Sequence, residues 1–100
     1  MAYYLLTYYL TDDYLARRPA FRAEHLELAS DAHAKGELIL GGALADPADR
    51  ALLVFRAGHV GVAEAFAKKD PYVRNGLVRK WDVRLWNVVV GNEKPTPRSG

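Results

Sequence analysis

DPYVRNGLV (residues 70–78), which leads into WDVRLW (residues 81–86), is the stretch that decides how this chain folds. Pro71 has no backbone N–H and a fixed φ, so a helix that runs through residues 63–69 must stop or turn there. Gly76 accepts the positive φ that lets the chain reverse into a strand. Asp70 therefore lies on a conformationally fixed corner, where a carboxylate can be a functional group or a plain capping residue.

The composition describes one small domain. The chain has 100 residues, and its 14 Lys and Arg residues exceed its 12 Asp and Glu residues by a net charge of only +2. The cations are scattered, whereas nucleic-acid binding usually shows as a basic cluster, and no apolar run approaches the ~18 residues of a membrane span. The lack of cysteine removes disulfides, thiolate metal sites and cysteine nucleophiles. We expect a soluble, cytoplasmic protein that has neither nucleic acid nor membrane as a partner.

Apolar periodicity on both sides of the corner predicts the order β-α-β-β-α-β. Strands are expected where apolar residues alternate or run continuously, and helices where they recur at helical spacing. The predicted strands are residues 2–10, 37–45, 51–55 and 77–90, and the predicted helices are residues 21–35 and 60–69. The two middle strands flank a turn and should pair as a hairpin.

Two helices that cover one face of a four-stranded antiparallel sheet give an α+β fold of the ferredoxin-like split β-α-β type. The first and last strands are rich in Tyr and Trp and are apolar on their other face as well. Because an exposed apolar sheet of this size marks an interface, we expect a homodimer that packs sheet against sheet. The domain comprises residues 1–92, and the polar, proline-rich residues 93–100 are expected to form a flexible tail.

Several motifs, in this order and spacing, resemble the YCII-related family. They are Arg22-x-x-His25-Leu26, Gly36-x-Leu38-Ile39-Leu40-x-Gly42, Ala63-x-x-Phe66, Asp70-Pro71-Tyr72, Gly76-Leu77 and Val83-Arg84-Leu85-Trp86. The resemblance implies a dimeric α+β barrel, related in architecture to muconolactone isomerases and small cofactor-free monooxygenases. It also implies an active site formed by a helix histidine and the Asp of the Asp-Pro-Tyr motif, which are His25 and Asp70 here.

His25 lies on the apolar stripe of the first helix, where a lone histidine can also be a core residue satisfied by its neighbours. In the arrangement that the resemblance implies, Asp70 bonds one ring nitrogen of His25, which fixes the tautomer and raises the basicity of the other nitrogen. Such a pair can act as a general base near neutral pH. Asp70 could at the same time accept the N–H groups of Tyr72 and Val73 in an Asx-type turn.

Three further residues are candidates for substrate binding. Arg22 shares nearly one helix face with His25 and could hold an anion as a bidentate fork, or it could form a surface ion pair with a helix glutamate. Tyr72 could line an apolar pocket, or belong to the core or the dimer interface. Gly42 belongs to a glycine pair inside a strand, which marks a bulge or the close approach of a ligand or another backbone.

These residues predict a cofactor-free enzyme that acts on a small, anionic or aromatic molecule. His25 would take a proton and Asp70 would orient it, in a lyase or isomerase reaction. We expect no metal site, because His33 lies about two helical turns from His25, too far for both to bind one ion. A non-catalytic dimeric module that binds a small molecule or has a regulatory role is the main alternative. A heme- or quinol-handling monooxygenase of similar architecture is a third.

Overall fold

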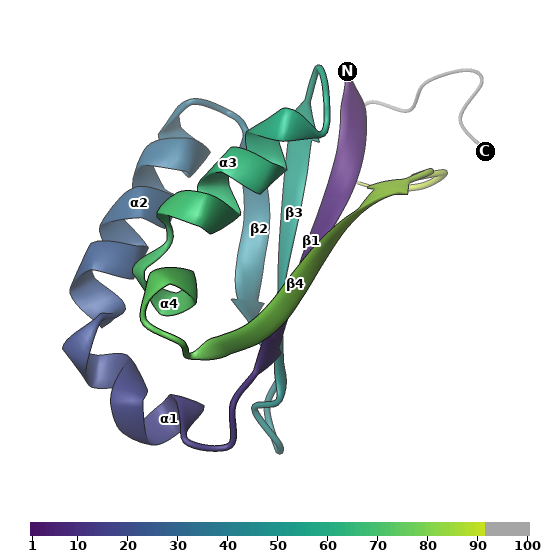
Figure 1. Cartoon of the computed structure of the whole chain (residues 1–100). Helices are drawn as coiled ribbons and strands as arrows, with labels where there is room; N and C mark the ends of the chain where they lie inside the picture. The colour runs from purple at the N-terminus through teal and green to yellow at the C-terminus, as the bar shows by residue number, and fades with distance from the viewer. Residues whose placement is uncertain (92–100) are drawn as a thin grey trace.

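The fold is a four-stranded antiparallel sheet with all of its helices on one face (Figure 1). It is seen in a computed structural model that describes residues 1–91. The strands are β1 (Ala2–Leu10), β2 (Leu38–Ala43), β3 (Arg50–Ala57) and β4 (Val78–Trp86). The helices are α1 (Tyr14–Arg17), the 3-10 helix η1 (Arg18–Ala20), α2 (Arg22–Ala34), α3 (Gly61–Lys69) and α4 (Pro71–Arg74). The strand order β2-β3-β1-β4 places β1 between β3 and β4, which confirms the ferredoxin-like split β-α-β fold of the α+β class.

The largest differences from the expected elements are three additional short helical segments and an earlier end of the last strand, and the bounds of the two middle strands shift by one or two residues. Two short helical segments, α1 and η1, precede α2, and a third, α4, follows Asp70. A segment of three or four residues is too short to show a helical period, so the sequence pattern does not reveal it. The last strand ends at Trp86 rather than at residue 90. The expected tail, residues 93–100, lies outside the described residues.

The core lies between the sheet and the helices. Leu6, Tyr8 and Leu10 alternate along β1 and are almost fully buried, as one face of a strand must be when helices cover it. Phe55 of β3 meets Phe66 of α3 edge to face, with ring centroids 5.3 Å apart. This contact joins α3 to the centre of the sheet.

Within residues 1–91, the opposite face of the sheet carries no helix. Since side chains alternate along a strand, the register of β1 with its two neighbours assigns the side chains of this face. They are Tyr3, Leu5, Thr7, Tyr9, Arg50, Leu52, Val54, Arg56, Lys80, Asp82, Arg84 and Trp86. Leu5, Leu52 and Val54 form an apolar centre, and charged side chains border it.

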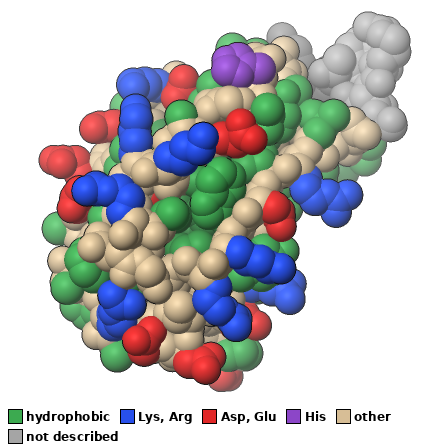
Figure 2. Space-filling view, in the orientation of Figure 1, with side chains coloured by type: hydrophobic (Ala, Val, Ile, Leu, Met, Phe, Trp, Pro, Cys, Tyr) green, Lys and Arg blue, Asp and Glu red, His purple; other side chains and the backbone are tan. Residues whose placement is uncertain are grey.

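The surface charges are mixed. On the side shown in Figure 2, Lys and Arg side chains alternate with Asp and Glu side chains and form no extended patch of one sign. Within residues 1–91, no helix has the length and apolar character needed to cross a lipid bilayer.

Candidate active site

Asp70 ends α3 and begins α4. Its extended backbone (φ −68°, ψ 124°) breaks the helix, and Pro71 occupies the first position of α4, where a missing N–H costs nothing. The Asp70 Oδ1 accepts the backbone N–H of Tyr72 at 3.0 Å, as expected for a capping residue. The N–H of Val73 is bonded differently from the expectation, because it donates to the main-chain oxygen of Asp70 at 3.0 Å.

The side chain of Asp70 is fully buried and accepts hydrogen bonds from two other elements. The Tyr8 hydroxyl of β1 donates to its Oδ2 at 2.8 Å. The His25 Nδ1 of α2 lies 2.9 Å from both of its oxygens. A carboxylate has no hydrogen to donate, so in a neutral His25 ring the proton lies on Nδ1 and Nε2 keeps its lone pair. No described residue hydrogen-bonds Nε2, which leaves that nitrogen for a ligand.

Tyr72 fixes the plane of the His25 ring. The two rings stack with centroids 4.0 Å apart and an interplanar angle of 11°. Tyr14 in turn meets Tyr72 edge to face, at a centroid distance of 5.7 Å. His25 therefore cannot tilt without displacing two buried aromatic rings.

Tyr8 and Tyr72 both remain protonated near neutral pH. Burial, and then the neighbouring Asp70 carboxylate, raises the pKa of the Tyr8 hydroxyl above its ordinary value. Burial and then Tyr14 raise the pKa of Tyr72 to about 12, although the charges of Arg22 and Arg18 act in the opposite direction. Tyr8 thus stays a hydrogen-bond donor to Asp70.

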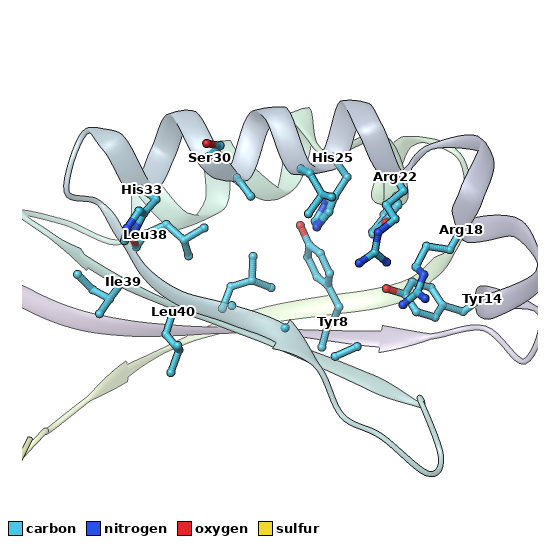
Figure 3. Close-up of a pocket in the computed structure, with 18 residues that line it drawn as sticks. Tyr8, Tyr14, Arg18, Arg22, His25, Ser30, His33, Leu38, Ile39 and Leu40 are labelled. Carbon is cyan, nitrogen blue, oxygen red and sulfur yellow. The ribbon is translucent and has the colours of Figure 1, made fainter.

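A cavity of about 430 Å³ lies between α2 and the edge strand β2. Figure 3 shows the 18 residues that line it, and none of them is acidic. Arg22, His25, Gly42 and Tyr72 are all among them, so the structure brings four of the five predicted site residues to one cavity. The fifth, Asp70, is bonded to His25 from behind the cavity wall.

Arg22 points into the cavity (Figure 3). The alternative considered for it, an ion pair with a glutamate of its own helix, is not formed in the described part of the chain. Glu24 instead lies 3.6 Å from Arg74 at the surface. The charge of Arg22 is therefore available to a ligand.

Sequence reasoning did not assign roles to Arg18 and Tyr14, and it did not predict the hydrogen bond between Tyr8 and Asp70. Arg18 lines the cavity with its guanidinium carbon 5.5 Å from the centre of the Tyr14 ring. Arg18 precedes Arg22 by four residues, a spacing that places two side chains on one helix face. This spacing could have indicated that both line one site, although Pro19 interrupts the helical pattern between them. Within residues 1–91, no group of three or more potential ligand side chains could hold a metal ion.

Together, the split β-α-β sheet and the buried His–Asp pair beside a cavity define a small ferredoxin-like α+β protein with a pocket on its helical side. Residues 1–87 match the YCII-related domain, and the chain belongs to that family. No curated protein sequence matches this chain.

Solved structures share the fold. One is the 5-chloro-2-hydroxyhydroquinone dehydrochlorinase TftG from Burkholderia phenoliruptrix AC1100, in complex with 2,5-dihydroxybenzoquinone. It is 20% identical at a TM-score of 0.71, and the match covers 84% of this chain and 92% of that chain. Another is a NIPSNAP family protein from Agrobacterium tumefaciens, 12% identical at a TM-score of 0.55, with 97% and 94% of the two chains covered.

Proposed function

We propose that this protein is an enzyme that removes a proton from a small molecule through His25, followed by elimination or isomerisation, with no cofactor required. One observation carries the proposal. The His25 ring is bonded through Nδ1 to a buried carboxylate at 2.9 Å, while the ring lines a cavity large enough for a ligand. This arrangement supplies an oriented base with one free nitrogen.

Each neighbour of His25 has a role in the proposed step. Nε2 takes the substrate proton, and the buried Asp70 stabilises the imidazolium that forms. Tyr8 and the backbone of Tyr72 hold the carboxylate in place, and the Tyr72 ring holds the imidazole plane. Arg22 binds negative charge on the substrate. The proton then returns to another atom in an isomerisation, or departs together with a leaving group in an elimination.

Dehydrochlorination, the activity named for TftG, belongs to the second class. A proton and a chloride ion leave one substrate molecule, so the step needs neither oxidant nor reductant. The substrate named for TftG is therefore a rational first probe for this chain.

The test measures chloride release from 5-chloro-2-hydroxyhydroquinone, and deuterium uptake from solvent into 2,5-dihydroxybenzoquinone, by the wild-type protein and by His25→Gln. Glutamine can still donate to Asp70 but cannot accept a proton. We expect the wild type to accelerate at least one reaction and the variant, with an unchanged circular dichroism spectrum, to lose the acceleration. An acceleration that the folded His25→Gln variant retains in full would refute His25 as the base.

We also propose a homodimer that forms through the helix-free face of the sheet. An apolar centre bordered by charges is typical of a protein interface. Trp86, on this face, is 46% exposed in the single chain, and Leu40 of the edge strand is 70% exposed. The cytoplasmic location remains a prediction from the sequence.

A further inference from the structure

The cavity has a cationic end, and its other end is lined mainly by apolar side chains around His33. Figure 3 shows Tyr14, Arg18 and Arg22 together at one end, His25 near the middle, and His33 with Leu38 at the other. At the far end, the His33 Nδ1 is tied to the Leu38 carbonyl oxygen at 2.7 Å. The wall between His25 and this end includes Ala29, Leu38 and Leu53.

The charges at the cationic end are not neutralised by neighbouring acids. Neither Arg18 nor Arg22 forms an ion pair with an acidic side chain in residues 1–91. Arg18 is half-buried and lies over the Tyr14 ring, which restricts where its guanidinium can point. Both guanidinium charges also act on the Tyr72 hydroxyl group, whose pKa they lower against the effect of burial. Two positive charges therefore act close to the ring on which His25 stacks.

We propose that the substrate is a carboxylate whose anionic end binds Arg18 and Arg22, whose acidic C–H lies at His25, and whose apolar body extends along β2 toward Leu38. This inference rests on the proposed function and adds the substrate class and its orientation. Guanidinium groups match a carboxylate as planar forks. They also stabilise the negative charge that develops on a carboxylate when the neighbouring carbon loses its proton.

The size of the cavity limits the apolar body. A volume of about 430 Å³ is at the lower end of the range for small-molecule sites. It suits one ring or a short branched chain. The glycine pair at positions 41 and 42 lines the same wall. Gly41 pairs with the core residue Leu53 and therefore faces the helical side, where an added Cβ would already lie 3.5 Å from the Leu53 side chain. The absence of a side chain at Gly41 therefore leaves room for the apolar part of the substrate along β2.

The test compares binding of trans-cinnamate with binding of its neutral amide, cinnamamide, which has the same shape. The proteins are the wild type, Arg18→Gln, Arg22→Gln and the control Lys68→Gln, which removes the same charge from an exposed position outside the cavity. We expect the wild type to bind cinnamate more tightly than the amide. Each arginine variant should weaken cinnamate binding about tenfold, equivalent to about 1.4 kcal/mol, without changing amide binding. The Lys68→Gln control should change the affinity for neither cinnamate nor cinnamamide.

Orientation is read from nuclear Overhauser effects between the cinnamate ring and the protein. We expect them at the methyl groups of Leu38 and Leu53. Equal affinities for the two probes, no effect of either arginine variant, ring contacts at Tyr14 instead, or no binding of either probe would overturn the inference. Cinnamate binding by His25→Gln separates the two proposals. If that variant binds cinnamate as the wild type does, the anion site stands on its own, whatever the rate measurements say about His25 as a base.

Discussion

Asp70→Asn separates the folding role of the corner from its chemical role. The amide oxygen can still accept the Tyr72 N–H, now bonded to Oδ1 at 3.0 Å. The amide nitrogen then takes the place of Oδ2, the oxygen that Tyr8 bonds at 2.8 Å. The Tyr8 hydroxyl can rotate and accept instead of donating. The His25 Nδ1, equally distant from both oxygens at 2.9 Å, would face a new N–H donor, so the tautomer with its proton on Nε2 becomes favoured.

The expected loss of stability is moderate. Three charge-assisted hydrogen bonds become neutral ones, at a cost of about 1 kcal/mol each. A neutral amide avoids the desolvation penalty of a buried carboxylate, which offsets part of that cost. We therefore expect a net loss of about 2 kcal/mol in the free energy of unfolding. Asp70→Ala should cost about twice as much, roughly 4 kcal/mol, because it removes the cap and leaves the buried Tyr8 hydroxyl and Tyr72 N–H without their acceptor.

The expected loss of activity is larger than the loss of stability. A nitrogen that already carries a proton cannot act as a base, and general-base catalysis contributes on the order of 100-fold or more to a rate. Urea unfolding measures the free-energy change, long-range ¹H–¹⁵N spectra identify the His25 tautomer, and chloride release measures the rate. Retention of the Nδ1–H tautomer together with a nearly wild-type rate would refute the reasoning. A fall in rate that only follows the unfolded fraction would do the same.

Three further predictions concern pH, the turn and the assembly. Burial raises the pKa of Tyr72 to about 12 and also raises that of Tyr8, so the folded chain keeps protons that unfolded tyrosines release near pH 10. The free energy of unfolding should therefore fall above about pH 10, by about 1.4 kcal/mol per pH unit for each proton retained. When the free energy of urea unfolding is plotted against pH between about pH 10 and about pH 12, Tyr8→Phe should reduce the slope by the contribution of one proton. An unchanged slope would contradict this prediction. Gly76→Ala should lower the free energy of unfolding, measured with urea, by about 1 kcal/mol because φ is +79° there, whereas Gly42→Ala, with open space around its Cβ, should not. Val54→Lys should convert the dimer to a folded monomer in analytical ultracentrifugation, and a wild type that is itself monomeric would rule out the proposed interface.

The sequence was informative where the physical cause is local. The Asp-Pro corner follows from the geometry of proline, and the buried face of β1 follows from strict alternation. The apolar stripe of α2 follows from helical spacing, and Phe21, His25, Leu28 and Ala29 along it are half-buried. The position of the corner therefore needed no tertiary information.

What the sequence did not reveal depends on packing between distant elements. The Tyr8–Asp70 bond joins residues 62 positions apart, and no periodicity tells which tyrosine of an aromatic strand will meet that carboxylate. Tyr4 lies on the same face of β1 as Tyr8, yet only Tyr8 is among the residues that line the cavity. The place of Arg18 depended on η1, a segment too short to have a detectable period.

Asp70 closes one helix, opens the next and holds the ring of His25. Any replacement that cannot accept the Tyr72 N–H therefore disturbs the backbone and the proposed chemistry at once, so the acid has little freedom to vary independently of the fold. No such combination of a folding role and a chemical role exists for the arginines on η1 and at the start of α2, or for the backbone of β2. New ligand preferences can consequently arise there by exchange of side chains without disturbing the His25–Asp70 pair.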